Sequence, residues 1–199
     1  MLVALPELCY EFDGDGTDEA SLGPTMTGGT YSAGGKLSSA LDGGATASVF
    51  ADPATSVAGD VTVGFWFQQP PASGSGTSLI EIGNTAGGYV KFYTVCNAGT
   101  ITQATVSSGN VVIKLSSVIA GWSHVVFQQS GTTVTVFVNG SSVASGTIAI
   151  DSGVSGIVKF DATGAGLFDQ FFIASRAMSA SEIAYLYNSG DGLAYADMD

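Results

Sequence analysis

Alternation of apolar and polar residues is clearest over Gly121–Val143, where it predicts three antiparallel strands joined by tight turns. Val, Thr, Phe and Trp dominate this stretch, and these side chains suit a pleated, half-buried surface. Ser130-Gly131 closes the first turn and Asn139-Gly140 the second, and Asn-Gly favours a type I′ turn because both central residues need positive φ. One face of the middle strand is apolar, and we expect it to be buried: Val134, Val136 and Val138.

The rest of the chain predicts further short strands, separated by Gly, Asn or Pro. They are Leu8–Phe12, Thr46–Phe50, Val61–Gln69, Ser78–Ile82, Tyr89–Val95, Thr100–Val106, Val111–Leu115, Thr147–Ile150, Ile157–Phe160 and Leu167–Ala174. We expect Asp52-Pro53 to break one strand, and Pro70-Pro71 to end the next, because proline cannot donate to a sheet ladder. The spacing predicts an all-β sandwich, with one domain over residues 1–199.

One short helix is predicted near the C-terminus. Ser179-Ala180-Ser181-Glu182 has the sequence of a capping box, with Met178 placed to take part in a hydrophobic staple. Gly190 is a suitable C-terminal stop. The helix should lie against the sandwich through an apolar face formed by Ile183, Leu186 and Tyr187.

Charge narrows the range of partners. The net charge is −12, and only five basic residues, scattered along the sequence, accompany 17 acidic ones. Nucleic acids need clustered Lys and Arg, so we exclude them as partners, and an anionic membrane would repel the chain. No apolar run approaches the length of a membrane span. The pairing of the two cysteines, Cys9 and Cys96, cannot be deduced from the sequence.

Three stretches together carry a family resemblance: Val61–Phe67, Trp122–Gly140 and Phe168–Ile183. In this order they resemble the laminin-G-like members of the concanavalin-A-like jelly-roll superfamily. The resemblance implies a two-sheet antiparallel jelly-roll sandwich with one short C-terminal helix. It says little about function, because this fold hosts lectins, adhesion modules, glycosidases and virion parts.

Calcium is the cofactor that the resemblance implies, because related domains often hold one Ca²⁺ near the chain ends. Asp13, Asp15 and Asp18 lie in one early loop, and Asp169 stands at the family's acidic position in the last strand. Gly-rich loops supply carbonyl oxygens as well as carboxylates, as Ca²⁺ requires. The alternative is that these aspartates only make turns and cap a strand end.

No catalytic signature is found. Retaining glycosidases of this fold carry paired glutamates in a Glu-x-Asp-x-x-Glu strand, and none of the five glutamates fits that pattern: Glu7, Glu11, Glu19, Glu81 and Glu182. His124 is the only histidine, and the adjacent Ser123 faces the opposite side of its strand. We therefore expect a structural role for His124 and a protein that is not an enzyme.

Aromatic residues are candidates for glycan stacking, and the sequence offers Tyr31, Tyr89 and Tyr93 as platforms. Trp66 and Trp122 are alternatives, although tryptophans in such strands are more often core residues.

The expected function is that of a non-enzymatic structural or binding module. We expect a virion surface protein of a bacteriophage, as a capsid decoration or tail-associated subunit. Its expected partners are other subunits of a capsid or tail lattice, copies of itself in a homo-oligomer, and surface glycans. The chain begins almost at its first strand, shows no signal peptide, and is rich in Gly, Ala, Ser, Thr and Val. The alternative is a calcium-dependent carbohydrate-binding or adhesion domain of a secreted protein. A glycoside hydrolase is a third reading.

Overall fold

Two antiparallel sheets make up the protein. In the eight-stranded sheet the strands are β1 (Leu8–Tyr10), β2 (Thr30–Ala33), β3 (Ser39–Asp42), β5 (Val61–Gln68), β10 (Ser123–Ser130), β11 (Thr133–Val138), β12 (Ser141–Thr147) and β14 (Leu167–Ala174). In the six-stranded sheet they are β4 (Ser48–Ser56), β6 (Gly76–Gly83), β7 (Tyr89–Asn97), β8 (Thr100–Ser108), β9 (Val111–Lys114) and β13 (Ser155–Ala162).

The computed structural model describes these strands, one α-helix, the 3-10 helices η1 (Asn188–Gly190) and η2 (Tyr195–Asp197), and their connections. The described residues are 5–6, 8–17, 19–21, 30–42, 48–56, 60–68, 76–83, 89–97, 100–108, 111–114, 121–147, 155–162 and 166–198. For the strands of the six-stranded sheet the description covers the backbone and its register.

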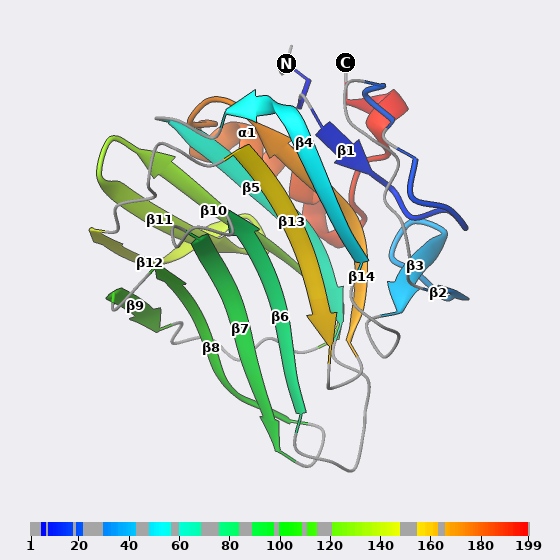
Figure 1. Cartoon of the computed structure of the whole chain (residues 1–199), viewed down its shortest axis with the longest axis horizontal. Helices are drawn as coiled ribbons and strands as arrows, with labels where there is room; N and C mark the ends of the chain where they lie inside the picture. Colours follow the sequence, from blue (N-terminus) through cyan, green and yellow to red (C-terminus); the bar gives the residue numbers. More distant parts are fainter. Residues whose placement is uncertain are drawn as a thin grey trace.

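The strand orders are those of a sandwich (Figure 1). The larger sheet runs β12-β11-β10-β5-β14-β3-β2, and the smaller runs β4-β13-β6-β7-β8-β9. Beyond the point where β3 stops, β1 pairs with the same edge of β14, with Leu8 opposite Ile173. The predicted all-β sandwich with antiparallel sheets is therefore confirmed.

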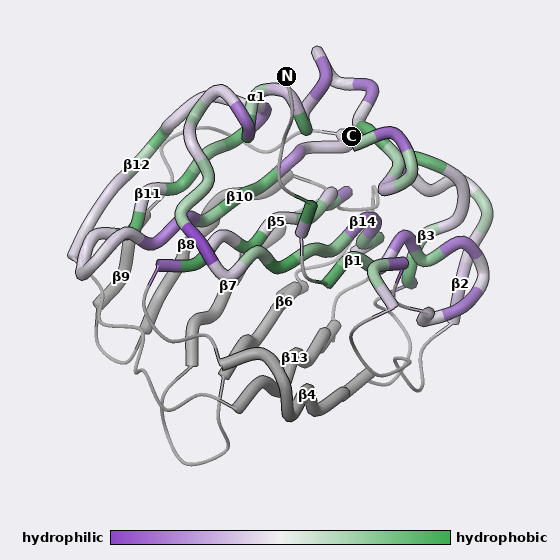
Figure 2. The backbone as a smooth tube through the Cα atoms, turned by 90° about the horizontal axis from the view of Figure 1, so that it is seen from above, coloured by the Kyte–Doolittle hydropathy of each residue, from purple (hydrophilic) through white to green (hydrophobic). Residues whose placement is uncertain are grey.

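Strand alternation divides the apolar side chains between two cores, one on each side of the eight-stranded sheet. In β5, Val63 and Phe65 belong to the core between the sheets. Phe172 and Val126 lie on the opposite side, in a second core under the C-terminal helix. Figure 2 shows the hydrophobic residues concentrated along β5, β10 and β14, with the helix beyond them. The order of layers is therefore six-stranded sheet, eight-stranded sheet and helix.

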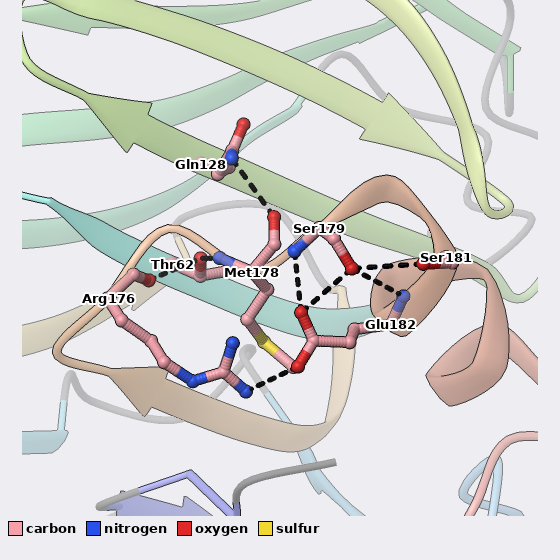
Figure 3. A network of polar contacts seen from close by, with 7 residues as sticks. All are labelled: Thr62, Gln128, Arg176, Met178, Ser179, Ser181 and Glu182. Atoms are coloured by element: carbon pink, nitrogen blue, oxygen red, sulfur yellow. Dashed lines mark hydrogen bonds and ion pairs between the residues drawn. The ribbon is translucent and has the colours of Figure 1, made fainter. Parts of the chain in front are cut away.

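The helix α1 (Ala180–Tyr187) starts with the predicted capping box. Ser179 Oγ accepts a hydrogen bond from the Glu182 amide, and the Glu182 carboxylate accepts one from the Ser179 amide at 2.7 Å (Figure 3). Glu182 also forms an ion pair with Arg176 at 2.8 Å, and this partner lowers the pKa of Glu182 to about 2. Met178 and Ile183 are both fully buried under the helix, as the staple predicts.

The segment before the helix is tied to the eight-stranded sheet. Thr62 Oγ1 donates to the Arg176 carbonyl at 2.8 Å and accepts from the Met178 amide at 2.9 Å. Gln128 Nε2 donates to the Met178 carbonyl at 3.0 Å (Figure 3). No helix in the described part of the chain is long and apolar enough to span a membrane.

One hairpin was missed, and two local predictions were wrong. The β2–β3 hairpin was not predicted, because its strands are short and lie in a Gly-rich region. Pro53 does not break its strand: β4 continues to Ser56, and it is an edge strand, where the missing N–H of proline is tolerated. The helix ends at Asn188, in the left-handed conformation with φ of 48°, before Gly190, because asparagine also tolerates that region.

The two cysteines lie in different sheets. Cys9 belongs to β1 and is buried on the helix side of the eight-stranded sheet, whereas Cys96 belongs to β7.

Candidate functional site

A bulge in β14 positions Asp169. Between Asp169 and Phe172 the strand gains one residue relative to β5, and Gln170 takes a positive φ of 43°. Positive φ is uncommon for residues other than glycine, so the surroundings must hold this conformation. The bulge falls in the gap where pairing with β3 stops and pairing with β1 begins. It therefore turns two polar residues toward segments outside the sheet ladder.

Asp169 binds the turn between β2 and β3. Its side chain is fully buried, and Oδ2 accepts from the Leu37 amide at 2.9 Å. Oδ1 accepts from the Gln170 amide at 2.7 Å. A Cβ atom on Gly35 would lie 2.8 Å from the Asp169 carboxylate, so the close approach of this turn requires glycine. Asp169 is thus an anchor for the β2–β3 hairpin.

The other aspartates of the predicted calcium set are placed differently. Asp13 is exposed and Oδ1 accepts from the Ser39 amide at 3.4 Å, so it approaches the same hairpin as Asp169. Asp15 accepts from the Thr17 amide at 2.8 Å within its own loop. Asp18 lies outside the described residues.

Burial, before any other cause, raises the pKa of Asp169 to about 7. Backbone amides, among them that of Leu37, oppose this rise, and the charge of Asp13 adds to it. Among the described residues, no three His, Cys, Asp or Glu side chains form a group that could hold a metal ion. Both Asp169 oxygens already accept backbone amides, so the described residues do not form a ready calcium site. Calcium binding by the full predicted set stays a prediction.

Two polar residues at the bulge, Gln170 and Glu11, were missed from the sequence. The Gln170 side chain donates to the Leu193 carbonyl, and the Glu11 carboxylate accepts from the Tyr195 amide. Burial first, and then the charges of Asp13 and Glu19, raise the pKa of Glu11. These contacts join the first strand, the bulge and the C-terminal segment. No sequence signal reveals them, because both backbone partners lie in the C-terminal segment after α1, far from the bulge in sequence.

The lone histidine is buried in an aromatic cluster beneath α1. The ring centroid of His124 lies 5.0 Å from that of Trp66 and 6.3 Å from those of Tyr187 and Phe172. Burial lowers the pKa of His124 to about 3, so the ring is neutral at ordinary pH. Within the described residues neither ring nitrogen has a hydrogen-bond partner. The predicted structural role of His124 fits this packing, and the buried Trp66 cannot serve as a glycan platform.

Tyr31 is separated from the other two predicted glycan platforms. It lies in β2, at one edge of the eight-stranded sheet, whereas Tyr89 and Tyr93 belong to β7 in the other sheet. Its ring packs at 6.4 Å from Phe12 and against the core between the sheets. Partial burial and the charge of Asp15 raise the pKa of its hydroxyl. Tyr31 is therefore partly occupied in packing.

The register of the six-stranded sheet assigns residues to its two faces, because residues opposite each other in neighbouring strands share a face. One row is apolar through five strands: Phe160, Ile80, Phe92, Val106 and Ile113. From this apolar row we infer that this face lies toward the eight-stranded sheet. The opposite face, called here the outer face, carries all five charged residues at paired positions: Glu81, Lys91, Lys114, Lys159 and Asp161.

Tyr89 and Tyr93 share the outer face with Lys91, at alternate positions of β7. In register, Lys91 stands next to Glu81, and Glu81 stands next to Lys159. Figure 1 shows this sheet in front and α1 behind the other sheet, with no described helix or strand over the outer face. The five basic residues are scattered in sequence only, since the fold gathers three of them here. These residues are neighbours only because their strands pair.

Solved structures resemble this chain over most of its length. Domain 4 of AbnA, an extracellular arabinanase of Geobacillus stearothermophilus seen with arabinotriose, matches with a TM-score of 0.67 and 19% identity, covering 92% of this chain and 98% of that one. The binding domain of botulinum neurotoxin serotype D/C matches with a TM-score of 0.67 and 12% identity over 92% of this chain. The present chain spans 52% of that toxin domain. At such identities the likeness shows the fold alone.

No curated protein sequence matches the chain. One family model does, over residues 42–184, and it describes the concanavalin A-like lectin/glucanases superfamily. The match includes all three stretches that carry the resemblance: Val61–Phe67, Trp122–Gly140 and Phe168–Ile183. The chain belongs to the concanavalin A-like lectin/glucanases superfamily.

Proposed function

We propose that the protein is a non-enzymatic carbohydrate-binding module that binds glycans with the outer face of the six-stranded sheet. The observation that carries the proposal is the register, in which Tyr89, Lys91 and Tyr93 take alternate positions of β7, on the side of the sheet over which Figure 1 shows no described helix or strand. Tyrosine combines an apolar ring with a polar hydroxyl, which suits a ligand that is apolar on its ring faces and polar at its rim. Charged residues beside the tyrosines supply hydrogen bonds that fix orientation.

The comparisons support this function at the level of the fold. Domain 4 of the arabinanase is named in complex with arabinotriose, and a botulinum neurotoxin DC binding domain with SialylT. The latter matches with a TM-score of 0.63 and 11% identity over 86% of this chain. Carbohydrate binding is thus a use to which related folds are put.

The described glutamates support a module without catalysis. Glu182 is held by the helix cap and Arg176, and Glu11 accepts the Tyr195 amide. Glu81 stands in register between Lys91 and Lys159, with Asp161 as its diagonal neighbour in β13, and the chain lacks the Glu-x-Asp-x-x-Glu strand that retaining glycosidases of this fold carry. The expected virion surface location and lattice partners stay predictions from the sequence alone, as does the alternative of a secreted adhesion domain.

The test is binding of the full chain to a panel of plant, bacterial and animal polysaccharides, with Tyr93→Ala as the variant. We expect a loss of affinity of about tenfold or more, because a buried aromatic contact is worth on the order of 1–2 kcal/mol. Tyr31→Ala is the matched control, since it makes the same change in the other sheet. The unfolding midpoint of each variant shows that it is folded.

Two results would contradict the proposal. Loss of binding in Tyr31→Ala, with full binding in Tyr93→Ala, would place the glycan site at the β2 edge of the eight-stranded sheet. Release of reducing ends from a bound polysaccharide, abolished by Glu81→Gln, would show an enzyme.

A further inference from the structure

The β2–β3 turn reaches the bulge through its backbone amides. Asp169 Oδ2 accepts from the Leu37 amide at 2.9 Å, and the Lys36 amide is a further donor to the same carboxylate. Oδ1 accepts from the Gln170 amide at 2.7 Å. The described partners of this buried carboxylate are therefore N–H donors, whereas a calcium site is made of oxygen atoms.

Asp13 approaches the same turn. Its Oδ1 accepts from the Ser39 amide at 3.4 Å, two residues after Leu37. The charge of Asp13 adds to the rise in the pKa of Asp169, so the two carboxylates are near enough to interact. Two members of the predicted calcium set thus bind one turn, through amides two residues apart.

The turn leaves little room for an ion at Asp169. A Cβ atom on Gly35 would lie 2.8 Å from Asp169 Oδ2 and 2.1 Å from the Ser39 carbonyl oxygen, so the backbone of Gly35 is packed beside the carboxylate. Calcium binds at about 2.3–2.6 Å from its oxygens and needs about six to eight of them. An ion at Oδ2 would have to displace the Leu37 amide, and a buried amide without a partner is costly.

The third described member of the set is occupied within its own loop. Asp15 is exposed, and its Oδ1 accepts from the Thr17 amide at 2.8 Å. Aspartate commonly binds a backbone amide two residues on in such turns. Each described aspartate of the predicted set therefore has a backbone amide as its partner.

We infer that the β2–β3 turn takes the place of the predicted calcium ion, so that Asp169 holds the hairpin to the sheet through backbone amides and without a cation. N–H groups that converge on a carboxylate supply the positive ends of their dipoles, and such hydrogen bonds are strong. Gln170, the next residue of the bulge, donates to the Leu193 carbonyl. The bulge thus fastens both the hairpin and the C-terminal segment, and Asp169 is a positioning residue.

A calcium titration of the full chain tests the inference. Thermal unfolding is followed at pH 8, where the Asp169 carboxyl, with a pKa of about 7, is ionised and able to bind a cation. EDTA, calcium chloride and magnesium chloride are compared at equal ionic strength, and we expect midpoints within about 1 °C of each other. Calcium at one hundred times the Kd of a real site would instead raise the midpoint by about 5–10 °C. Because the full chain is used, the titration includes Asp18.

Solvent exchange of the Leu37 amide, measured by NMR, reports the contact itself. Asp169→Ala removes the acceptor and should speed this exchange by about tenfold or more, with or without calcium. Gly35→Ala keeps all four predicted calcium ligands, but its Cβ would push the turn from the carboxylate, so we expect faster exchange there too. Asp15→Ala is the matched control, because it removes an aspartate of the same set and should leave the Leu37 amide protected.

Two results would overturn the inference. One is a midpoint that calcium raises in the wild-type protein and not in Asp169→Ala. The other is a Leu37 amide that exchanges equally fast in the wild type, Asp169→Ala and Gly35→Ala.

The wild-type protein decides alone if the variants do not fold. Calcium can reach Asp169 Oδ2 only by displacing the Leu37 amide. Exchange of this amide that accelerates on addition of calcium would overturn the inference, and unchanged exchange would support it. Glycan binding enters none of these measurements, so the proposed function stands or falls separately.

Discussion

The two sheets use their outward sides in opposite ways. The side of the eight-stranded sheet away from the sandwich core is covered by α1 and packed with buried residues such as Trp66, His124 and Phe172. The corresponding side of the six-stranded sheet has no described element over it and carries Tyr93 and Lys91. One sheet thus contributes to stability on both faces, while the other has a face that we propose as the ligand site.

This difference has a chemical basis in the residues at alternate positions. In β5 the helix-side positions hold Thr62, Gly64 and Trp66, which are buried or offer room for a packed ring. In β7 the alternate positions 89, 91 and 93 hold Tyr, Lys and Tyr, residue types that tolerate contact with water. Substitutions on the helix side of the eight-stranded sheet should therefore lower stability, and substitutions on the outer face of the six-stranded sheet should lower glycan affinity.

The largest expected effect is that of Phe172→Ala. The ring is fully buried and fills the space beside Gly64, where an added Cβ would lie 2.3 Å from it. Removing the ring should lower the free energy of unfolding by about 3–5 kcal/mol, because a cavity is left in the helix-side core. Tyr93→Ala should lower it by about 1 kcal/mol or less. Urea unfolding of both variants measures the difference.

The comparison fails if Tyr93→Ala destabilises the protein as much as Phe172→Ala does. Such a result would mean that the outer face of the six-stranded sheet is packed against another part of the protein.

The pH dependence of stability provides the next effect. His124 is neutral when folded, since burial lowers its pKa from 6.5 to about 3, and it becomes protonated below pH 6.5 when unfolded. Its contribution to stability is therefore present above pH 6.5 and declines as the pH falls toward 3. Relative to His124→Leu, the wild-type protein should lose about 3 kcal/mol of stability between pH 7 and pH 4.

Asp169 acts in the opposite sense. Its folded pKa, raised from 3.8 to about 7, makes the folded protein more stable with this group protonated, and that stability is lost as the pH rises through 7. The His124→Leu variant should thus be more stable at pH 4 than at pH 7. Urea midpoints at these two values check both signs, and parallel profiles for wild type and variant would contradict the assignment to His124.

Local chemistry made part of this structure predictable. β14 was predicted to the residue, and the capping box of α1 was predicted atom by atom, because strand alternation and helix capping depend on neighbours in sequence. The bulge at Asp169 was not predicted. The Asp169 carboxylate accepts a hydrogen bond from the Leu37 amide, and a partner 132 residues away leaves no local pattern in the sequence. The β2–β3 hairpin that supplies this amide was missed as well.

The outer face shows the same limit. The tyrosines of β7 could be proposed as platforms from residue type alone, and Lys91 lies between them in the same strand, but Lys114 and Lys159 come from other strands. Which strand pairs with which is a property of the whole fold, so five scattered basic residues gave no sign of clustering.

The smallest expected effect concerns the helix cap on the covered side. Ser179→Ala removes an acceptor 3.3 Å from the Glu182 amide and a donor 2.8 Å from the Glu182 carboxylate. Loss of such a cap typically costs about 1 kcal/mol, so we expect the urea midpoint to fall slightly. Ser181→Ala is the matched control, because the exposed Ser181 hydroxyl lies 3.0 Å from Ser179 Oγ and caps no backbone amide.

Neither variant should change glycan affinity, since α1 lies on the opposite side of the sandwich from the outer face. A weakened glycan affinity in Ser179→Ala alone would show that the covered side influences the ligand face, and the division of roles between the two sheets would then be incorrect.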